Sequence, residues 1–415
     1  MATPSSQQPS LPPGLKYYRS TVDELLHGSL YLDTFVTSRR GVKNVALPLP
    51  GSSNPSDITG LQIFGQVQPL SIKTTVLNGG LRGAATLGSS RSGMSLRWVL
   101  CPEDEFALPD KQPLPTLFDA RASQRFTMMD VELWLDEGRK NAFQGFGAGR
   151  TYPAVVAGED QLWLGACGKI LQGTGVFENV QGSFVLNGRI TPPDEIAAAL
   201  LIRVLATASG EPVAGPPSLE RASAASLGAP SPLAGSTYLT FLGAPDPASP
   251  ISQDKAGGTL SGASVTELLR PVRVQYRLGN DGRSLQAHYA TEDWIAARLQ
   301  TNIRFNLNPS DPTSGTPLSP FPWHCEGTTI TFFDPKGQEL GTIACNITEG
   351  RGFNTEFAGF PAPTVFNLVG FGPFAGGTGS FAGAQGMLSV NSGICADPTT
   401  LSNLYVLRLA HAGRR

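Results

Sequence analysis

Acidic and basic residues inside apolar segments are the first candidates for chemistry in this sequence. Asp130 and Asp334 occupy matching positions 204 residues apart, and Arg203 and Arg408 match at a spacing of 205. A charge inside an apolar strand is costly unless it is paired and hydrogen-bonded. The pattern suggests one Asp–Arg pair in each half, in which the arginine holds a carboxylate or enolate oxygen and the aspartate moves a proton. A structural ion pair, or separate surface charges at strand ends, would produce the same pattern.

The densest cluster of reactive side chains is Trp323-His324-Cys325-Glu326. On a strand, alternation puts His324 and Glu326 on one face and Cys325 on the other. The histidine and the glutamate would then act as a general base and its orienting partner. The first half has Ser123-Gln124-Arg125 near the equivalent place, so this function would belong to the second half alone. A partly buried histidine satisfied by a neighbour is the alternative.

Aromatic residues supply the candidate walls of a ligand cavity, since ligand pockets are lined mainly by apolar and aromatic groups with a few polar ones. The candidates for substrate binding are Trp98, Phe146, Tyr152, Trp163, Trp323 and Phe357. Aromatic side chains on strands are equally expected as ordinary core. The sequence alone leaves both interpretations open.

Several well-defined chemistries have no counterpart in the sequence. It contains no GxSxG nucleophile elbow, no HExxH, no P-loop and no metal-spaced group of Cys and His. The glycine-rich run at 145–149 lacks the spacing of a dinucleotide-binding loop. We therefore expect neither a cofactor nor a metal ion.

The composition also narrows the class of partner and the compartment. A formal net charge of −2 provides no electrostatic footprint for nucleic acid or for an anionic membrane surface. No window approaches the roughly 18 apolar residues of a membrane helix, and the N-terminal residues resemble no secretory signal. The five cysteines are dispersed and odd in number, which indicates free thiols in a reducing compartment. We expect a cytoplasmic protein that binds neither nucleic acid nor a membrane surface.

One stretch of the chain occurs twice. Residues 173–187 and 377–391 are identical at seven positions, the pairs Gly173/Gly377, Thr174/Thr378, Gly175/Gly379, Phe177/Phe381, Gln181/Gln385, Gly182/Gly386 and Asn187/Asn391. Three further anchors recur in the same order at offsets between 204 and 207, which indicates two copies of one domain of roughly 180 residues. We expect each copy to close its own core.

The duplication predicts the domain organisation. We expect a disordered arm and a short helical lead-in at 1–28, a first domain at 29–208, a linker rich in Pro, Ala and Ser at 209–234, and a second domain at 235–415. Short extended runs separated by turn residues predict an all-β fold, with one helical candidate at 291–299. About eight strands fit in each copy, and closing them into a barrel removes exposed edges.

The repeated Gly-Thr-Gly-x-Phe-x-x-x-x-Gly pattern resembles the late-strand signature of the allene oxide cyclase and dirigent family. Residues 379–386 are the most similar to it. The resemblance implies two tandem eight-stranded antiparallel barrels of the calycin type, each with a mostly apolar cavity. Members of this family bind reactive lipophilic intermediates and steer their cyclisation or coupling by confinement. No catalytic residue of the family aligns with this sequence.

These observations favour a cofactor-independent cyclase or isomerase acting on a lipophilic, polyketide- or terpenoid-like intermediate. Such catalysis would depend on folding the substrate into a reactive conformation and excluding water. A binding protein without turnover is the first alternative. A structural or interaction module with filled barrels is the second.

Overall fold

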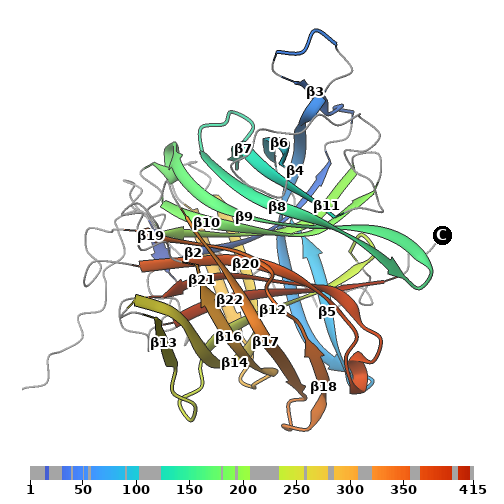
Figure 1. Cartoon of the computed structure of the whole chain (residues 1–415), viewed down its shortest axis with the longest axis vertical. Coiled ribbons are helices and arrows are strands. Elements are labelled where there is room, and N and C mark those ends of the chain that lie inside the picture. Colours follow the sequence, from blue (N-terminus) through green and yellow to red (C-terminus); the bar gives the residue numbers. More distant parts are fainter. Residues whose placement is uncertain are drawn as a thin grey trace, which may run out of the picture.

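The computed structural model describes residues 15–17, 30–38, 41–49, 51–54, 58–88, 91–101, 123–178, 181–191, 195–205, 233–256, 259–278, 285–306, 320–355, 365–394 and 401–411. Strands make up most of these ranges, and within them there is no α-helix. The expected all-β class is confirmed. Figure 1 shows the strands of the first half, blue to green, stacked above those of the second half, yellow to red.

The first half forms a closed eight-stranded antiparallel barrel. The strands of the first half, which include two outside the barrel, are β2 (Leu30–Ser38), β3 (Val45–Pro48), β4 (Ile58–Leu77), β5 (Gly80–Leu87), β6 (Ser92–Cys101), β7 (Gln124–Trp134), β8 (Ala142–Val156), β9 (Glu159–Gly173), β10 (Gln181–Thr191) and β11 (Glu195–Leu205). The barrel order is β2-β11-β10-β9-β8-β7-β6-β4, and it closes because β2 pairs with β4 as well as with β11. Strands β3 and β5 add to β4 outside this ring.

The second half forms a sheet with a similar strand order. Its strands are β12 (Ser236–Pro245), β13 (Ser252–Ala256), β14 (Thr259–Leu278), β15 (Leu285–Thr291), β16 (Ala297–Phe305), β17 (Phe321–Phe333), β18 (Glu339–Ala344), β19 (Glu349–Thr355), β20 (Val365–Ala375), β21 (Gln385–Ile394) and β22 (Leu401–Ala410). The order is β14-β12-β22-β21-β20-β19-β17-β16, and β14 also pairs with β16. The short strand β1 (Leu15–Tyr17) adds in parallel to β15.

The two longest strands change partners near a proline. β4 pairs with β2 up to Pro69 and then with β5, and β14 pairs with β12 up to Pro271 and then with β15. Proline has no backbone N–H to give to a ladder, so it suits the end of a pairing. Each long strand therefore belongs to its own sheet at one end and extends beyond it at the other.

The expectation of a helix at 291–299 is wrong. The chain there turns and enters β16, where Ala297 and Leu299 pair with Phe332 and Ile330 of β17. Helix propensity is a weak preference that strand pairing and burial override. Of the arm and lead-in at 1–28, only β1 is described, as a strand; the linker at 209–234 lies outside the described residues except for its last two.

The duplicated signature forms a tight turn followed by a strand. In each copy a short 3₁₀ helix, Gly175–Phe177 or Gly379–Phe381, leads into β10 or β21. The phenylalanine of each turn is buried and packs on another ring, Phe177 on Phe143 and Phe381 on Phe332. Glycine is required at the first turn position, since φ is +60° at Gly175 and +57° at Gly379.

The two halves share apolar packing. The largest hydrophobic core includes barrel residues of the first half together with residues from the outer face of the second sheet. Phe35 of β2, for example, meets Tyr238 of β12 edge to face at 6.0 Å between ring centroids. The expectation that each copy closes its own core therefore does not hold: the first core continues into the interface, and the core inside the second sheet includes Leu81 of β5 from the first half.

Candidate functional site

The interior of the second sheet contains a cavity of about 100 Å³. Its wall is mainly apolar, formed by Leu299, Trp323, Ile347, Leu368, Leu388 and Val390 among others. The half-buried Ile251 and exposed Gln253 also line it, so the cavity reaches the surface near β13. A cavity of this size is comparable to one that binds benzene, at about 150 Å³.

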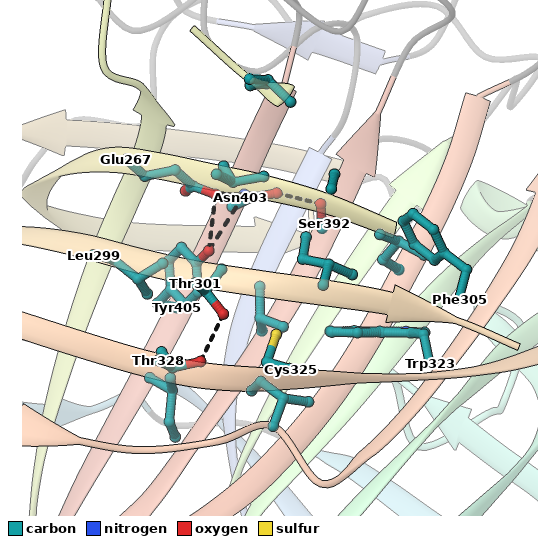
Figure 2. A pocket seen from close by; sticks show the side chains of 18 of the residues that line it. Glu267, Leu299, Thr301, Phe305, Trp323, Cys325, Thr328, Ser392, Asn403 and Tyr405 are labelled. Carbon is teal, nitrogen blue, oxygen red and sulfur yellow. Dashed lines mark hydrogen bonds between the residues drawn. The ribbon is translucent and has the colours of Figure 1, made fainter. Parts of the chain in front are cut away.

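A buried carboxyl group is part of this wall. Glu267 of β14 is 1% exposed, and its Oε1 accepts hydrogen bonds from Asn403 Nδ2 at 2.5 Å and from the Tyr405 hydroxyl at 3.1 Å. Ser392 in turn donates to Oδ1 of Asn403. Figure 2 shows this group at one side of the cavity, with Trp323 and Phe305 on the other. Among the described residues, the second carboxyl oxygen, Oε2, has no hydrogen-bond partner.

Burial changes the acidity of the groups in this wall. Loss of water raises the pKa of Glu267 to about 7, against smaller lowering effects from Tyr405 and Asn403. Burial, followed by the nearby Glu267, raises the pKa of Tyr405 well above its usual value. A carboxyl that titrates near neutral pH serves equally well as proton acceptor and proton donor. The Tyr405 hydroxyl remains a hydrogen-bond donor.

The first barrel has no counterpart of this polar group. The strand registers make Gly65 equivalent to Glu267 and Ala198 and Leu200 equivalent to Asn403 and Tyr405. All three polar residues are thus replaced by glycine or an apolar residue in the first copy. The divergence places the candidate chemistry in the second half.

A glycine in the second copy makes room for the carboxyl. A Cβ atom at Gly243 would lie 2.3 Å from Oε2 of Glu267. The equivalent residue of the first copy is Val36, whose Cγ1 lies against Gly65. The two copies have exchanged a large and a small residue between neighbouring strands, which is the volume-conserving change that a packed interior tolerates.

The remaining polar groups of the cavity wall are weaker candidates for chemistry. Thr301 and Thr328 hydrogen-bond to each other at 2.6 Å. Burial raises the pKa of the nearby Cys325 to about 11, so its thiol stays protonated and is a poor nucleophile. Trp323 lines the cavity, and its buried Nε1 has no hydrogen-bond partner in the part of the chain that the structure describes. This N–H is the second unsatisfied polar group of the wall, after Glu267.

The expected Asp–Arg pairs do not form. Asp130 has φ of +46° at a β-bulge and pairs on the surface with Arg97. Asp334 lies in the turn after β17, where its Oδ1 accepts from the backbone of Lys336 and Gln338. Neither aspartate forms an ion pair with Arg203 or Arg408.

Arg203 and Arg408 lie between the two halves and not in a cavity. Arg203 Nη1 donates to Asn367 Oδ1 at 2.5 Å and to the Ser392 carbonyl at 2.9 Å. Arg408 Nε donates to Asn187 Oδ1 at 3.1 Å. Both arginines are at most 1% exposed. Strand alternation turns them toward the other half, so they are structural in this arrangement.

The last shared residue of the signature forms a symmetric contact. Asn187 Nδ2 donates to the carbonyls of Met387 and Val406, and Asn391 Nδ2 donates to those of Ser183 and Leu201. The accepting residues match at the offsets of the duplication, 204 and 205. The two copies therefore face each other as a symmetric dimer would.

His324 and Glu326 lie on the exposed face of β17, and Cys325 is buried, as alternation predicts. His324 Nε2 is 3.4 Å from the Glu326 carboxylate, which also pairs with Arg304. Hydrogen bonds from Arg304, then from His324, lower the pKa of Glu326. The couple is formed, but it points away from the cavity.

The aromatic candidates are dispersed. Trp98 stacks on Phe126 in the first barrel, at 3.5 Å between centroids. Trp163 is buried beneath Arg408, and the half-buried Tyr152 hydrogen-bonds to Thr348 across the halves. Phe146 is half-buried on β8, and Phe357 lies outside the described residues. Of the six candidates, Trp323 lines the cavity.

Sequence reasoning missed Glu267, Asn403 and Tyr405. A signal was present, because Glu267 lies in Val265-Thr266-Glu267-Leu268-Leu269, where a charge is as costly as at Arg203. The charges of Arg203 and Arg408 recur in both copies, whereas Glu267 does not recur. Asn403 and Tyr405 carry no comparable signal, since polar residues on a strand are common.

Comparison with known proteins identifies no family for the chain. No family model, curated protein or solved structure matches the chain. Within the described ranges, no group of three or more His, Cys, Asp or Glu side chains is placed to hold a metal ion. In the same part of the chain, no helix combines the length and the apolar character needed to cross a bilayer.

Proposed function

We propose that the chain is a cofactor-independent isomerase or cyclase, and that the cavity of the second half binds the reacting part of a small lipophilic carbonyl compound. The observation that carries the proposal is the Glu267 carboxyl, buried in an apolar cavity wall with one oxygen unpaired. Because its pKa lies near neutral pH, such a carboxyl can take a proton from a carbon next to a carbonyl as a carboxylate and return it to another carbon as a carboxylic acid. No other reagent is consumed in this step.

The rest of the cavity suits the same chemistry. Asn403 and Tyr405 hold the carboxyl in one position, and the Trp323 N–H is a donor for an oxygen that becomes negative when the carbon loses its proton. The apolar wall excludes water and strengthens both interactions. The opening near Gln253 allows a longer tail of a polyketide- or terpenoid-like substrate to extend outward.

We also propose that the second sheet is a barrel, like the first half. Pairing of β14 with both β12 and β16 supports this arrangement. The resemblance of the duplicated signature to allene oxide cyclase and dirigent proteins supports cyclisation as the reaction class. Under this proposal the first barrel, with apolar residues in place of the polar group, is a structural partner of the second.

Hydrogen exchange into a simple ketone tests the proposal without knowledge of the natural substrate. Cyclohexanone in D₂O should exchange its α-hydrogens faster with the protein than in buffer, measured by proton NMR. Glu267→Gln should reduce the protein-dependent rate by about 100-fold or more, the range expected for loss of a general base. Glu339→Gln, at an exposed position of β18, is the matched control and should leave the rate unchanged.

A binding protein without turnover is the second candidate, favoured by the small volume of the cavity. It predicts saturable binding of cyclohexanone with exchange at the buffer rate in both the wild type and Glu267→Gln. That result would reject catalysis and retain the cavity as a ligand site. An equal protein-dependent rate in the two proteins would reject the role of Glu267.

A further inference from the structure

Strand ends and turns from both halves surround a hollow of about 650 Å³, which we call the crevice. The first half contributes the turn between β4 and β5 and the turn between β8 and β9. The second half contributes the residues that follow the 3₁₀ turn at Gly379–Phe381, and the end of β22. In Figure 1 the light-blue end of the β4–β5 hairpin reaches the red 3₁₀ turn. The crevice has the size of a ligand pocket, and such pockets occur preferentially where domains meet.

Contacts between the halves hold the walls of the crevice together. A Cβ atom at Gly80 would lie 3.7 Å from the Cβ of Ser380, so the hairpin of the first half touches the turn of the second. Leu81 is buried in the core of the second half. Gln161 of β9 donates from Nε2 to the His411 carbonyl at 3.0 Å. These contacts fix the shape of the crevice, so a ligand would enter a site that is already formed.

The ionisable side chains of the crevice are basic. Arg82 and His411 line it, and none of the described lining residues is acidic. Glu159 and Asp160, which follow the β8–β9 turn, are not among the lining residues. The other lining side chains include the polar Asn78, Ser380 and Gln385 and the buried apolar Leu81, Val156, Phe381 and Leu409. The described lining therefore combines positive charge and hydrogen-bonding groups with a buried apolar base.

Arg82 and His411 are close enough for one charge to affect the other. Burial, and then the positive charge of Arg82, lower the pKa of His411. His411 Nε2 is 2.7 Å from the Thr237 hydroxyl oxygen, a hydrogen bond that orients the ring. The His411 backbone N–H donates to the Gly235 carbonyl, and the guanidinium of Arg189 lies beside Gly235. The charged groups around His411 are thus basic, and a bound anion would favour its protonated form.

We propose that the crevice is a binding site for a small organic oxyanion, in which a phosphate, sulfate or carboxylate group is attached to an apolar body. The Arg82 guanidinium is planar and has several donors, which suits an oxyanion. Protonated His411 would supply a second positive charge, and the body would lie over the apolar base. This site is separate from the Glu267 cavity and does not depend on the proposed function.

The probe for this site is 4-fluorobenzenesulfonate, whose sulfonate stays ionised at neutral and mildly acidic pH. We expect it to bind the full chain saturably at mildly acidic pH, measured by fluorine NMR. Arg82→Gln should weaken that binding by about tenfold or more, the cost of losing a hydrogen bond between charged groups. Arg97→Gln, at an exposed arginine of β6, removes the same charge elsewhere and should bind like the wild type. The neutral 4-fluorobenzenesulfonamide should bind the wild type about tenfold more weakly than the sulfonate.

The pH dependence of binding gives a second readout, which belongs to His411. Protonation of the ring adds a positive charge beside the anion, so the affinity of the wild type should rise about threefold or more as pH falls from about 8 to about 5.5. The probe keeps its charge over this range, so the change comes from the protein. His411→Gln is neutral at every pH and should not show the rise.

Several results would overturn the proposal. The first is the absence of saturable binding up to about 20 mM, a concentration at which even a weak site fills. Wild-type affinity in Arg82→Gln would place the probe outside the crevice, and equal binding of the sulfonamide would show that charge is not recognised. An affinity of the wild type that is independent of pH, or an equal rise in His411→Gln, would also contradict it.

Discussion

At the scale of the residue, Glu267 combines two properties that rarely occur together. It is ionisable, and its surroundings disfavour the ionised form because they replace water with apolar side chains. Two hydrogen bonds from Asn403 and Tyr405 offset part of this cost but leave Oε2 unpaired. The carboxyl is therefore held in an unfavourable state, which is typical of functional sites.

The raised pKa of Glu267 should be visible in the stability of the protein. The pKa is about 7 in the folded state against 4.5 in an unperturbed glutamate. The folded state thus binds the proton more tightly, and the stability from this group is complete below pH 4.5 and is lost as pH rises toward 7. Glu267→Gln should not show this loss. The free energy of unfolding of the variant minus that of the wild type should therefore be about 1–3 kcal/mol larger at pH 8 than at pH 4.5.

Urea unfolding of both proteins at the two pH values measures this difference. Burial also raises the pKa of Asp33, which lies between the halves, but its contribution is the same in both proteins and cancels. Parallel pH profiles for wild type and Glu267→Gln would show that the carboxyl is not held in a raised-pKa state.

At the scale of the element, the two faces of one strand have different roles. In β22, Asn403 and Tyr405 line the cavity, whereas Leu404, Val406 and Arg408 face the other half. In β21, Ser392 lines the cavity and Asn391 reaches across. A shift of one residue would exchange the two sets. The register of these last two strands thus positions both the candidate site and the interface.

Asn187 should be important for joining the halves. Its Nδ2 donates to two backbone carbonyls of the second half at 3.0 and 3.2 Å, and its Oδ1 accepts from Arg408. Asn187→Ala leaves buried groups unsatisfied, including part of a buried cation, so it should lower the free energy of unfolding by about 3–5 kcal/mol. Asn306→Ala, at an exposed position, is the control. Urea denaturation checks the prediction, and a loss below about 1 kcal/mol would contradict it.

At the scale of the whole molecule, the two copies form one folded unit. Apolar residues of both halves share a core, and Glu349 of the second half pairs with two arginines of the first. The symmetric contacts of Asn187 and Asn391 bring the duplicated strands face to face. The divergence of the interiors then separates their roles: the second copy has the polar cavity wall, and the first has a packed interior at the equivalent positions.

Separating the copies tests this dependence. A protease site placed between residues 206 and 232 allows the chain to be cut without changing any described contact. The two fragments should remain together on gel filtration and unfold in one transition, because apolar residues of both halves share one core and buried polar groups of each half are satisfied by the other. Each half expressed alone should lose cooperative unfolding, measured by calorimetry. Two independent transitions from stable single halves would contradict a shared core.

The sequence by itself determined the all-β class, the duplication and the opposite faces of His324 and Cys325. These follow from local properties: turn residues end strands, and alternation is set by the backbone. It predicted a helix at 291–299, but the structure has a turn and the start of β16 there, because pairing with β17 outweighed helix propensity.

Only the tertiary structure decided which face of each strand meets the cavity. Arg203 and Tyr405 both lie on strands that are buried on two sides, so apolar neighbours do not distinguish the interior of a sheet from an interface between halves. Glu267 and Asn403 are 136 residues apart and meet because β14 and β22 both pair with β12. Contacts of this kind depend on how the sheet is assembled, which no local pattern records.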